Sequence, residues 1–119
     1  MENLFGLFRK RMKTFSCPYL GGEVELSDER ESHIAETHPE LLPEHEDQIG
    51  DTLRDPDQVR RSLRFANARL FSKWYDDLLT GKHLVVVVVS EALPKSRDWV
   101  VTAYVTRKIS EGDVEWKRS

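Results

Sequence analysis

Two histidines, His33 and His38, are the first residues of this sequence whose type suggests chemistry. A neutral imidazole can accept or donate a proton near neutral pH, so either histidine could act as a general base or a general acid. On an unbroken helix their five-residue spacing would put them roughly 140° apart. Pro39 follows directly and disfavours helical geometry at His38, so their relative direction stays open. A histidine beside a helix end can equally be an ordinary surface or capping residue.

Polar and aromatic side chains alternate with apolar ones later in the chain, and successive side chains of a strand point to opposite faces. Near residue 100 the apolar face, suited to packing under a helix, consists of Trp99, Val101, Ala103 and Val105. The opposite face carries Thr102, Tyr104 and Thr106. Two earlier strands each present a partly cationic side, formed by Arg60, Ser62 and Arg64 in one and by Phe71, Lys73 and Tyr75 in the other. We therefore expect Lys73 to share the uncovered sheet face with Thr102 and Tyr104, although this pattern is also typical of a solvated sheet surface.

Other chemistries have less support in the sequence. We find no glycine-rich phosphate loop, no helical His-Glu-x-x-His pair and no nucleophile elbow, and we expect no cofactor. A metal site could be assembled from His33, Glu36, His38 and Glu40, but that spacing is weakly specific. Cys17 has no partner cysteine and no neighbour in sequence that would activate a thiol, so we expect a small, half-buried strand residue.

The secondary-structure elements that would position these residues follow from the hydrophobic periodicity and from residues typical of helix ends and turns. Ser27 is a plausible N-cap for a helix from Asp28 to Thr37, and a second helix with an apolar stripe begins near Leu41 and stops at Asp55-Pro56. Short strands around Gly21-Gly22 are expected at 14–19 and 23–26. Later strands are expected at 59–65, 70–75, 83–90, 99–109 and 114–117. Five consecutive valines from Val85 favour a central strand buried on both faces, in a meander.

Length and composition point to one domain over residues 1–119, in which residues 1–22 are either flexible or an edge strand. The longest apolar run is too short to span a membrane, and with one cysteine a reducing cytoplasm fits best. The net charge of -3 is unevenly distributed, because residues 23–57 carry 13 acidic and 2 basic side chains whereas residues 58–119 carry 7 acidic and 12 basic ones. The folded domain could thus have an acidic and a basic face.

Several sequence pieces occur in a suggestive order. They are His33 to Glu40 (HIAETHPE), Thr52 to Asp57 (TLRDPD), Lys73, the run Leu84 to Val89, and Val100 to Tyr104 (VVTAY). This order resembles the phage-associated barnase-EndoU-colicin-RelE-like nucleases, over about residues 24–110. The resemblance implies an α+β domain with an N-terminal helical pair packed on a largely antiparallel, four- to five-stranded sheet. It also implies metal-independent RNA cleavage on the exposed sheet face.

By position, the resemblance matches His33 or His38 to the family's N-terminal histidine and Lys73 to its strand cation. It matches Thr102 and Tyr104 to a late polar pair, and Arg64 to an arginine. In the resulting hypothesis a base removes the ribose 2′-OH proton, the oxygen attacks the adjacent phosphate, and an acid protonates the leaving 5′-oxygen. Lys73 and Arg64 would stabilise developing charge on the phosphate, and Thr102 would donate a hydrogen bond.

RNA would be held by further residues of the same face. Arg60 and Arg64 would bind phosphates, while Tyr75, with Trp74 or Tyr104, could stack a base. The alternative hypothesis is a catalytically silent module that uses this face to bind RNA or a protein partner. The acidic segment at 23–57 could then engage a basic cognate protein, or it could serve solubility alone. No feature of the sequence indicates the oligomeric state.

Overall fold

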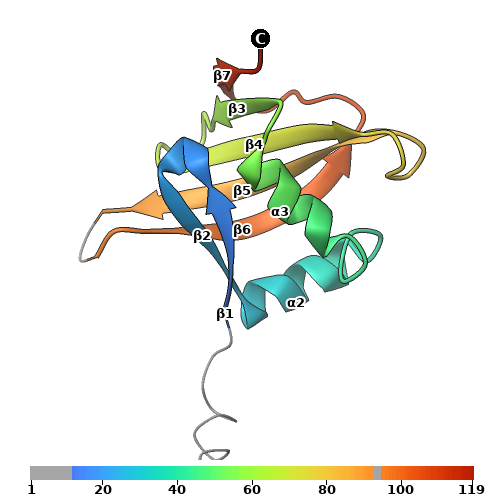
Figure 1. Cartoon of the computed structure of the whole chain (residues 1–119), viewed down its shortest axis with the longest axis horizontal. Coiled ribbons are helices and arrows are strands. Elements are labelled where there is room, and N and C mark those ends of the chain that lie inside the picture. Colours follow the sequence, from blue (N-terminus) through green and yellow to red (C-terminus); the bar gives the residue numbers. More distant parts are fainter. Residues whose placement is uncertain (1–11, 93–94) are drawn as a thin grey trace, which may run out of the picture.

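The structure is a computed structural model that describes residues 12–92 and 95–119. Across these residues, seven strands form one mixed sheet with the order β1-β2-β6-β5-β4-β3-β7 (Figure 1). The elements in chain order are β1 (Met12–Cys17), the 3-10 turn η1 (Pro18–Leu20), β2 (Gly22–Ser27), α2 (Asp28–Thr37), α3 (Glu46–Arg54), β3 (Gln58–Arg61), β4 (Ala68–Tyr75), β5 (Lys82–Glu91), β6 (Arg97–Thr106) and β7 (Asp113–Lys117).

The expected architecture of a helical pair on a four- to five-stranded, largely antiparallel sheet is wrong. A hairpin of β1 and β2 precedes the helices, and β2 joins the sheet through a parallel pairing of Glu25 with Trp99. The last strand, β7, crosses to the opposite edge and pairs with β3. Strands β3 to β6 do form the expected meander, with β5 in the centre. The fold differs from the expected one because the pairings of β2 with β6 and of β3 with β7 join segments that are not connected by a short turn.

The helices are set by local signals. The Ser27 side chain accepts a hydrogen bond of 3.2 Å from the Arg30 backbone N–H, so the predicted cap and the predicted range of α2 are confirmed. Helix α3 begins at Glu46, later than the expected start near Leu41, because residues 39–45 form turns. No helix in the described part of the chain combines the length and apolar character needed to cross a membrane.

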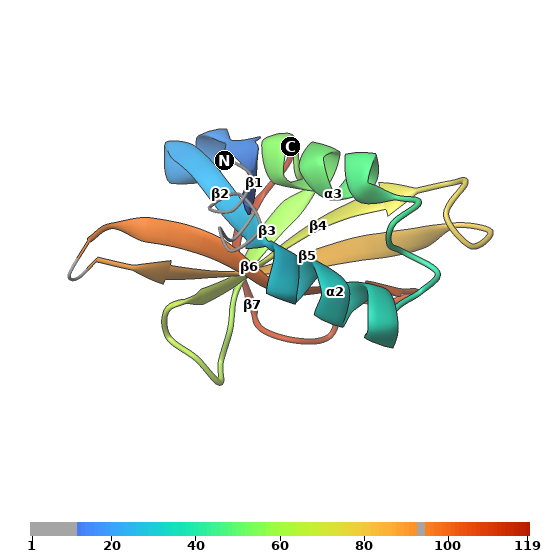
Figure 2. The same ribbon diagram turned by 90° about the horizontal axis from the view of Figure 1, so that it is seen from below.

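One face of the sheet is covered by α3 and by the β1–β2 hairpin (Figure 2). The core between them contains Ile49 and Leu53 of α3, Phe71 of β4, and Leu84 and Val86 of β5, all fully buried. Helix α2 instead lies along the exposed part of the β6 edge, where an Arg30 guanidinium N–H donates to the Val101 carbonyl at 3.3 Å. The covered face is therefore the side that carries the core.

Among the described residues, no helix covers the other face, which we call the open face. Two loops, at residues 62–67 and 107–112, project on this side (Figure 2). Its strand positions alternate with those of the core, so Leu70 and Val87 belong to the open face while Phe71 and Val86 belong to the core. The loops turn what would be a flat sheet surface into a concave one.

The expected alternation in β6 is interrupted by a β-bulge. Val87 pairs with Thr102, but Val88 pairs with Val100, so Val101 is the extra residue. Val100 and Ala103 consequently face the core, whereas Val101 does not belong to it. The expected apolar set of Trp99, Val101, Ala103 and Val105 is correct only for the last two residues.

Candidate functional site

A cavity of about 520 Å³ lies on the open face between the two loops. Its floor comes from strands β4, β5 and β6, and its rim comes from residues 62–67 and from Glu111. The lining residues are Ser62, Arg64, Phe65, Asn67, Ala68, Leu70, Val87, Val89, Val101, Thr102, Tyr104 and Glu111. The cavity thus combines an apolar floor with a polar rim that contains one cation and one anion.

The loop after β3 holds Arg64 at this rim. The buried Ser62 hydroxyl accepts hydrogen bonds of 3.1 Å from the backbone N–H groups of both Arg64 and Phe65, which fixes the start of the loop. The Arg64 guanidinium lies 5.8 Å from the centroid of the exposed Phe65 ring. These contacts leave Arg64 exposed beside the cavity.

Arg60 of β3 holds the loop at residues 107–112 against the sheet by hydrogen bonds. Its Nη1 donates to the carbonyls of Glu111 and Gly112, at 3.3 and 3.2 Å, and its Nε donates to the Gln58 side chain at 2.8 Å. Arg60 pairs with Leu70 and so lies on the open face, as expected. Part of its hydrogen-bonding capacity is used to hold the loop.

Tyr104 stands where the cavity meets α2. The ring centroids of Tyr104 and His38 are 6.4 Å apart, and His38 Nδ1 lies 3.3 Å from a carboxylate oxygen of Glu40. Burial, assisted by the charge of Glu111, raises the pKa of the Tyr104 hydroxyl despite the opposing charge of Arg60. At neutral pH Tyr104 is therefore a phenol that can donate a hydrogen bond.

The two candidate histidines are separated by the structure. His38 caps the C-terminal end of α2 and is adjacent to Tyr104. His33 is exposed on α2. Its backbone carbonyl accepts a hydrogen bond of 2.8 Å from the Thr37 hydroxyl. Only His38 is brought to the ring of a residue that lines the cavity.

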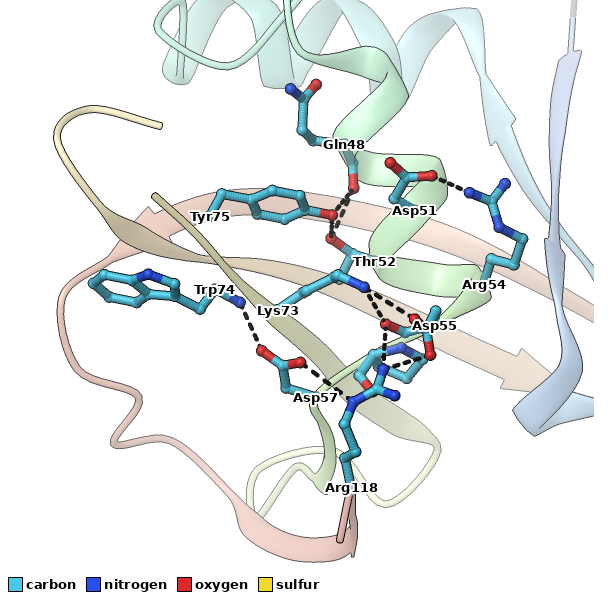
Figure 3. Close-up of polar contacts among 11 residues, drawn as sticks. Gln48, Asp51, Thr52, Arg54, Asp55, Asp57, Lys73, Trp74, Tyr75 and Arg118 are labelled. Carbon is cyan, nitrogen blue, oxygen red and sulfur yellow. Dashed lines mark hydrogen bonds and ion pairs between the residues drawn. The ribbon is translucent and has the colours of Figure 1, made fainter. Parts of the chain in front are cut away.

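Lys73 does not join this site, contrary to expectation. It pairs with Leu84, which is a core residue, so the Lys73 side chain lies on the helix-covered face. There its ammonium donates to the backbone carbonyl of Asp55 at 2.9 Å and to the Asp55 carboxylate at 3.2 Å (Figure 3). The side assignment was wrong because Phe71, two residues earlier, is fully buried in the core and fixes the register of this strand.

Tyr75 lies on the same covered face, so its expected contact with RNA is not supported by its position. Its hydroxyl is 3.0 Å from the Gln48 carbonyl and 3.1 Å from the Thr52 hydroxyl, both on α3 (Figure 3). Burial raises the pKa of Tyr75 to about 12. Tyr75 therefore anchors α3 to the sheet.

Several residues of the site were not predicted from the sequence. Asn67, Phe65 and Glu111 lie on loops, where the two-residue period gives no information about direction. His83 also lies on the open face, because it alternates with Leu84 of the core. The sequence did contain a signal for this position, because His83, Val85 and Val87 follow one another at a two-residue period and so share one face of a strand.

Two alternative chemistries can be examined directly. Within residues 12–92 and 95–119, no three or more His, Cys, Asp or Glu side chains are grouped so that they could hold a metal ion. Cys17 is fully buried rather than half-buried, and burial raises the pKa of its thiol, so it lacks the features of an activated nucleophile.

Comparison of the chain with protein-family models, curated proteins and solved structures found no match.

Proposed function

We propose that the chain is an endoribonuclease that cleaves RNA without a metal ion, using the open face of the sheet. The observation that carries this proposal is the meeting of His38 with Tyr104 at one end of the cavity that Thr102 and Arg64 also line. An imidazole, a phenol, a hydroxyl and a guanidinium are sufficient for acid–base catalysis with charge stabilisation on a phosphate. The order of sequence pieces that resembles the nuclease family supports the same chemistry.

Each of these side chains would have a distinct role in the cleavage reaction. His38, held by Glu40, removes the proton of the ribose 2′-OH, and the freed oxygen forms a bond to the adjacent phosphorus. The bond from phosphorus to the 5′-oxygen breaks, and the leaving oxygen takes a proton from an acid, for which Tyr104 is the candidate on this face. Thr102 and Arg64 stabilise the charge on the phosphate oxygens. The products are a 2′,3′-cyclic phosphate and a 5′-hydroxyl end.

A second candidate function is a catalytically silent module that binds RNA or a protein on the same face. It is favoured by the apolar cavity floor of Leu70, Val87 and Val89, and by the engagement of Arg60 with the loop at 107–112. Both features reduce the number of groups that are free to act on a phosphate.

One assay distinguishes the nuclease from the catalytically silent binding module. Labelled single-stranded RNA is incubated with the protein in EDTA, and the ends of the products are identified. We expect 2′,3′-cyclic phosphate ends, and we expect His38→Ala to lower the single-turnover rate by about 10²- to 10⁴-fold, the usual worth of a general acid or base. His33→Ala is the matched control, since this exposed histidine lies on the same helix, and it should cleave at the wild-type rate.

The outcome that rejects the nuclease is binding of RNA without cleavage by the wild-type chain, which would leave the binding module. Equal loss in both histidine variants would reject the assignment of His38. Activity that disappears in EDTA and returns with a divalent cation would reject the metal-free mechanism.

A further inference from the structure

An aromatic pair of one exposed and one half-buried ring lies at the end of the open face, away from the cavity lining. Trp74 of β4 and His83 of β5 are directly paired, with ring centroids 5.0 Å apart and planes inclined at 75°. Trp74 remains 42% exposed, whereas tryptophan side chains are highly buried on average. Neither residue contributes to the core cluster.

The indole of Trp74 is held in one orientation. The Trp74 backbone N–H donates to the Asp57 carboxylate at 2.8 Å (Figure 3). The indole Nε1–H donates to the Asp76 carboxylate at 2.7 Å. Gly81, at a φ of +99°, packs so closely that an added Cβ would lie 2.9 Å from the indole carbon Cζ2. A ring fixed in this way loses little conformational freedom when a flat ligand stacks on it.

The pair is a neighbour of the proposed reaction centre. Val85 pairs with Tyr104, and His83 precedes Val85 by two residues, so His83 and Tyr104 are diagonal neighbours on adjacent strands of the same face. Such neighbours are typically about 7–8 Å apart. A nucleotide next to the reacting phosphate is therefore within reach of the pair.

The charges around the pair distinguish a base from a phosphate. The charged group that bonds to the indole is the Asp76 carboxylate, and Asp77 follows it in the chain, so a phosphate is disfavoured directly beside the ring. Arg60, a cation of the open face, pairs with Leu70, which is four residues, or roughly 13 Å, along β4 from Trp74. A neutral, flat group therefore fits against the indole, and a phosphate fits closer to Arg60.

We propose that Trp74, supported by His83, is a stacking subsite for an unpaired nucleobase of single-stranded RNA. This inference rests on the proposed function insofar as it takes RNA to be the ligand of the open face. A base must be unstacked from its neighbours to use the site, so the subsite selects single strands over duplexes.

The test measures binding of a short oligoribonucleotide, single-stranded or annealed to its complement, by fluorescence anisotropy at several salt concentrations. All proteins carry His38→Ala so that the RNA stays intact. We expect Trp74→Ala to raise the single-strand Kd by about 5- to 100-fold without changing the salt dependence, because stacking releases no counterions. Trp74→Phe should retain most of the affinity.

Trp116→Ala is the matched control, because this indole is 38% exposed but lies on β7, in register with the core residue Val59. A second arm needs no change at Trp74: an oligonucleotide with one abasic position should lose the same affinity, and the loss should not add to that of Trp74→Ala. This arm keeps the test decisive if Trp74→Ala is poorly folded.

Equal affinity of Trp74→Ala and its parent for the single strand would overturn the subsite, as would additive losses or equal binding of the duplex. Cleavage by the wild-type chain, measured separately, decides the proposed function. A cleaving chain that is indifferent to Trp74 rejects the subsite alone, whereas a chain that binds through Trp74 without cleaving rejects the nuclease alone. A chain that does not bind RNA rejects both.

Discussion

At the scale of single residues, Lys73 shows how strongly the role of a side chain depends on the face it occupies. Its ammonium group and the Arg118 guanidinium both contact Asp55, at the end of α3 (Figure 3). Hydrogen bonds from Arg118 and then from Lys73 lower the pKa of the Asp55 carboxyl. The three residues connect a helix end, a central strand and the C-terminal end of the chain, which is a structural arrangement.

We therefore predict that Lys73→Ala lowers the thermal unfolding midpoint by a few degrees and leaves the cleavage rate at saturating RNA unchanged. The reason is that the variant loses a contact to α3 and none on the open face. Thermal unfolding followed by circular dichroism and single-turnover cleavage measure the two effects. Arg54→Ala is the control for loss of a positive charge on the covered side, because its side chain on α3 is 61% exposed. A catalytic defect with unchanged stability would restore Lys73 to the site.

The sequence contained enough information to group Thr102 with Tyr104, since alternation within one strand is a local property. The sequence did not predict that His38 lies beside Tyr104, because this contact depends on how α2 lies along the edge of β6. It also did not indicate which side of β4 faces the helices. Leu70 and Phe71 are adjacent, apolar and both buried, so either could have been the core residue.

At the scale of elements, local signals were reliable and distant pairings were not. Ser27 and the acidic first turn predicted α2 with correct bounds. The parallel pairing of β2 with β6 connects Glu25 to Trp99, and the bulge at Val101 depends on the register with β5. A pairing between distant strands leaves no trace in the hydrophobic periodicity of either strand, and a bulge interrupts the two-residue period from which the faces of a strand are predicted.

The loop at 107–112 is an element whose shape depends on one glycine. Gly112 has a φ of +80°, and an added Cβ would lie 2.7 Å from the Arg61 carbonyl oxygen. The contact is with backbone, so a side chain there forces the loop away from β3. The Glu111 carbonyl that accepts from Arg60 would move with it.

We predict that Gly112→Ala lowers the free energy of unfolding by about 1–3 kcal/mol, the usual cost of backbone strain with a steric clash. Gly22→Ala is the control, because no atom lies within 4 Å of the Cβ it would add. Urea denaturation of both variants measures the difference. Equal stability of the two variants would show that the loop adapts without cost.

At the scale of the whole molecule, the two ends of the sheet approach each other on the covered side. Tyr19, in the turn after β1, packs edge-on against Phe71, with ring centroids 5.9 Å apart. The Tyr19 ring also lies 6.0 Å from the Trp116 ring of β7, with the two planes inclined at 56°. Its hydroxyl donates to Glu115 of β7 at 2.5 Å. The turn after β1 and the last strand of the sheet order are thus joined by side chains, which favours a sheet that curls around the core on the covered side.

Glu115 is the anion on which this junction depends. Arg69 of β4 and Arg61 of β3 donate to its carboxylate at 2.8 and 2.9 Å, in addition to Tyr19. Burial alone would raise the pKa of Glu115, but the hydrogen bonds from Tyr19, Arg69 and Arg61 outweigh it and lower the pKa from 4.5 to about 2. The folded state therefore binds this proton more weakly than the unfolded chain does.

The pH dependence of stability follows from that difference. A carboxyl group whose pKa is lowered on folding stabilises the protein above its unfolded pKa of 4.5, and this contribution is lost as the pH falls towards about 2. We predict that Glu115→Gln lowers the free energy of unfolding at pH 7 by about 1–2 kcal/mol, after allowance for solvent screening. The difference from wild type should shrink steadily between pH 5 and pH 2.5, because the other carboxylates titrate alike in both proteins. Glu44→Gln, at a side chain that is 84% exposed, should track the wild type throughout. Urea denaturation across this pH range measures all three proteins, and a Glu115→Gln deficit that stays constant with pH would show that the ionised carboxylate does not hold the sheet ends together.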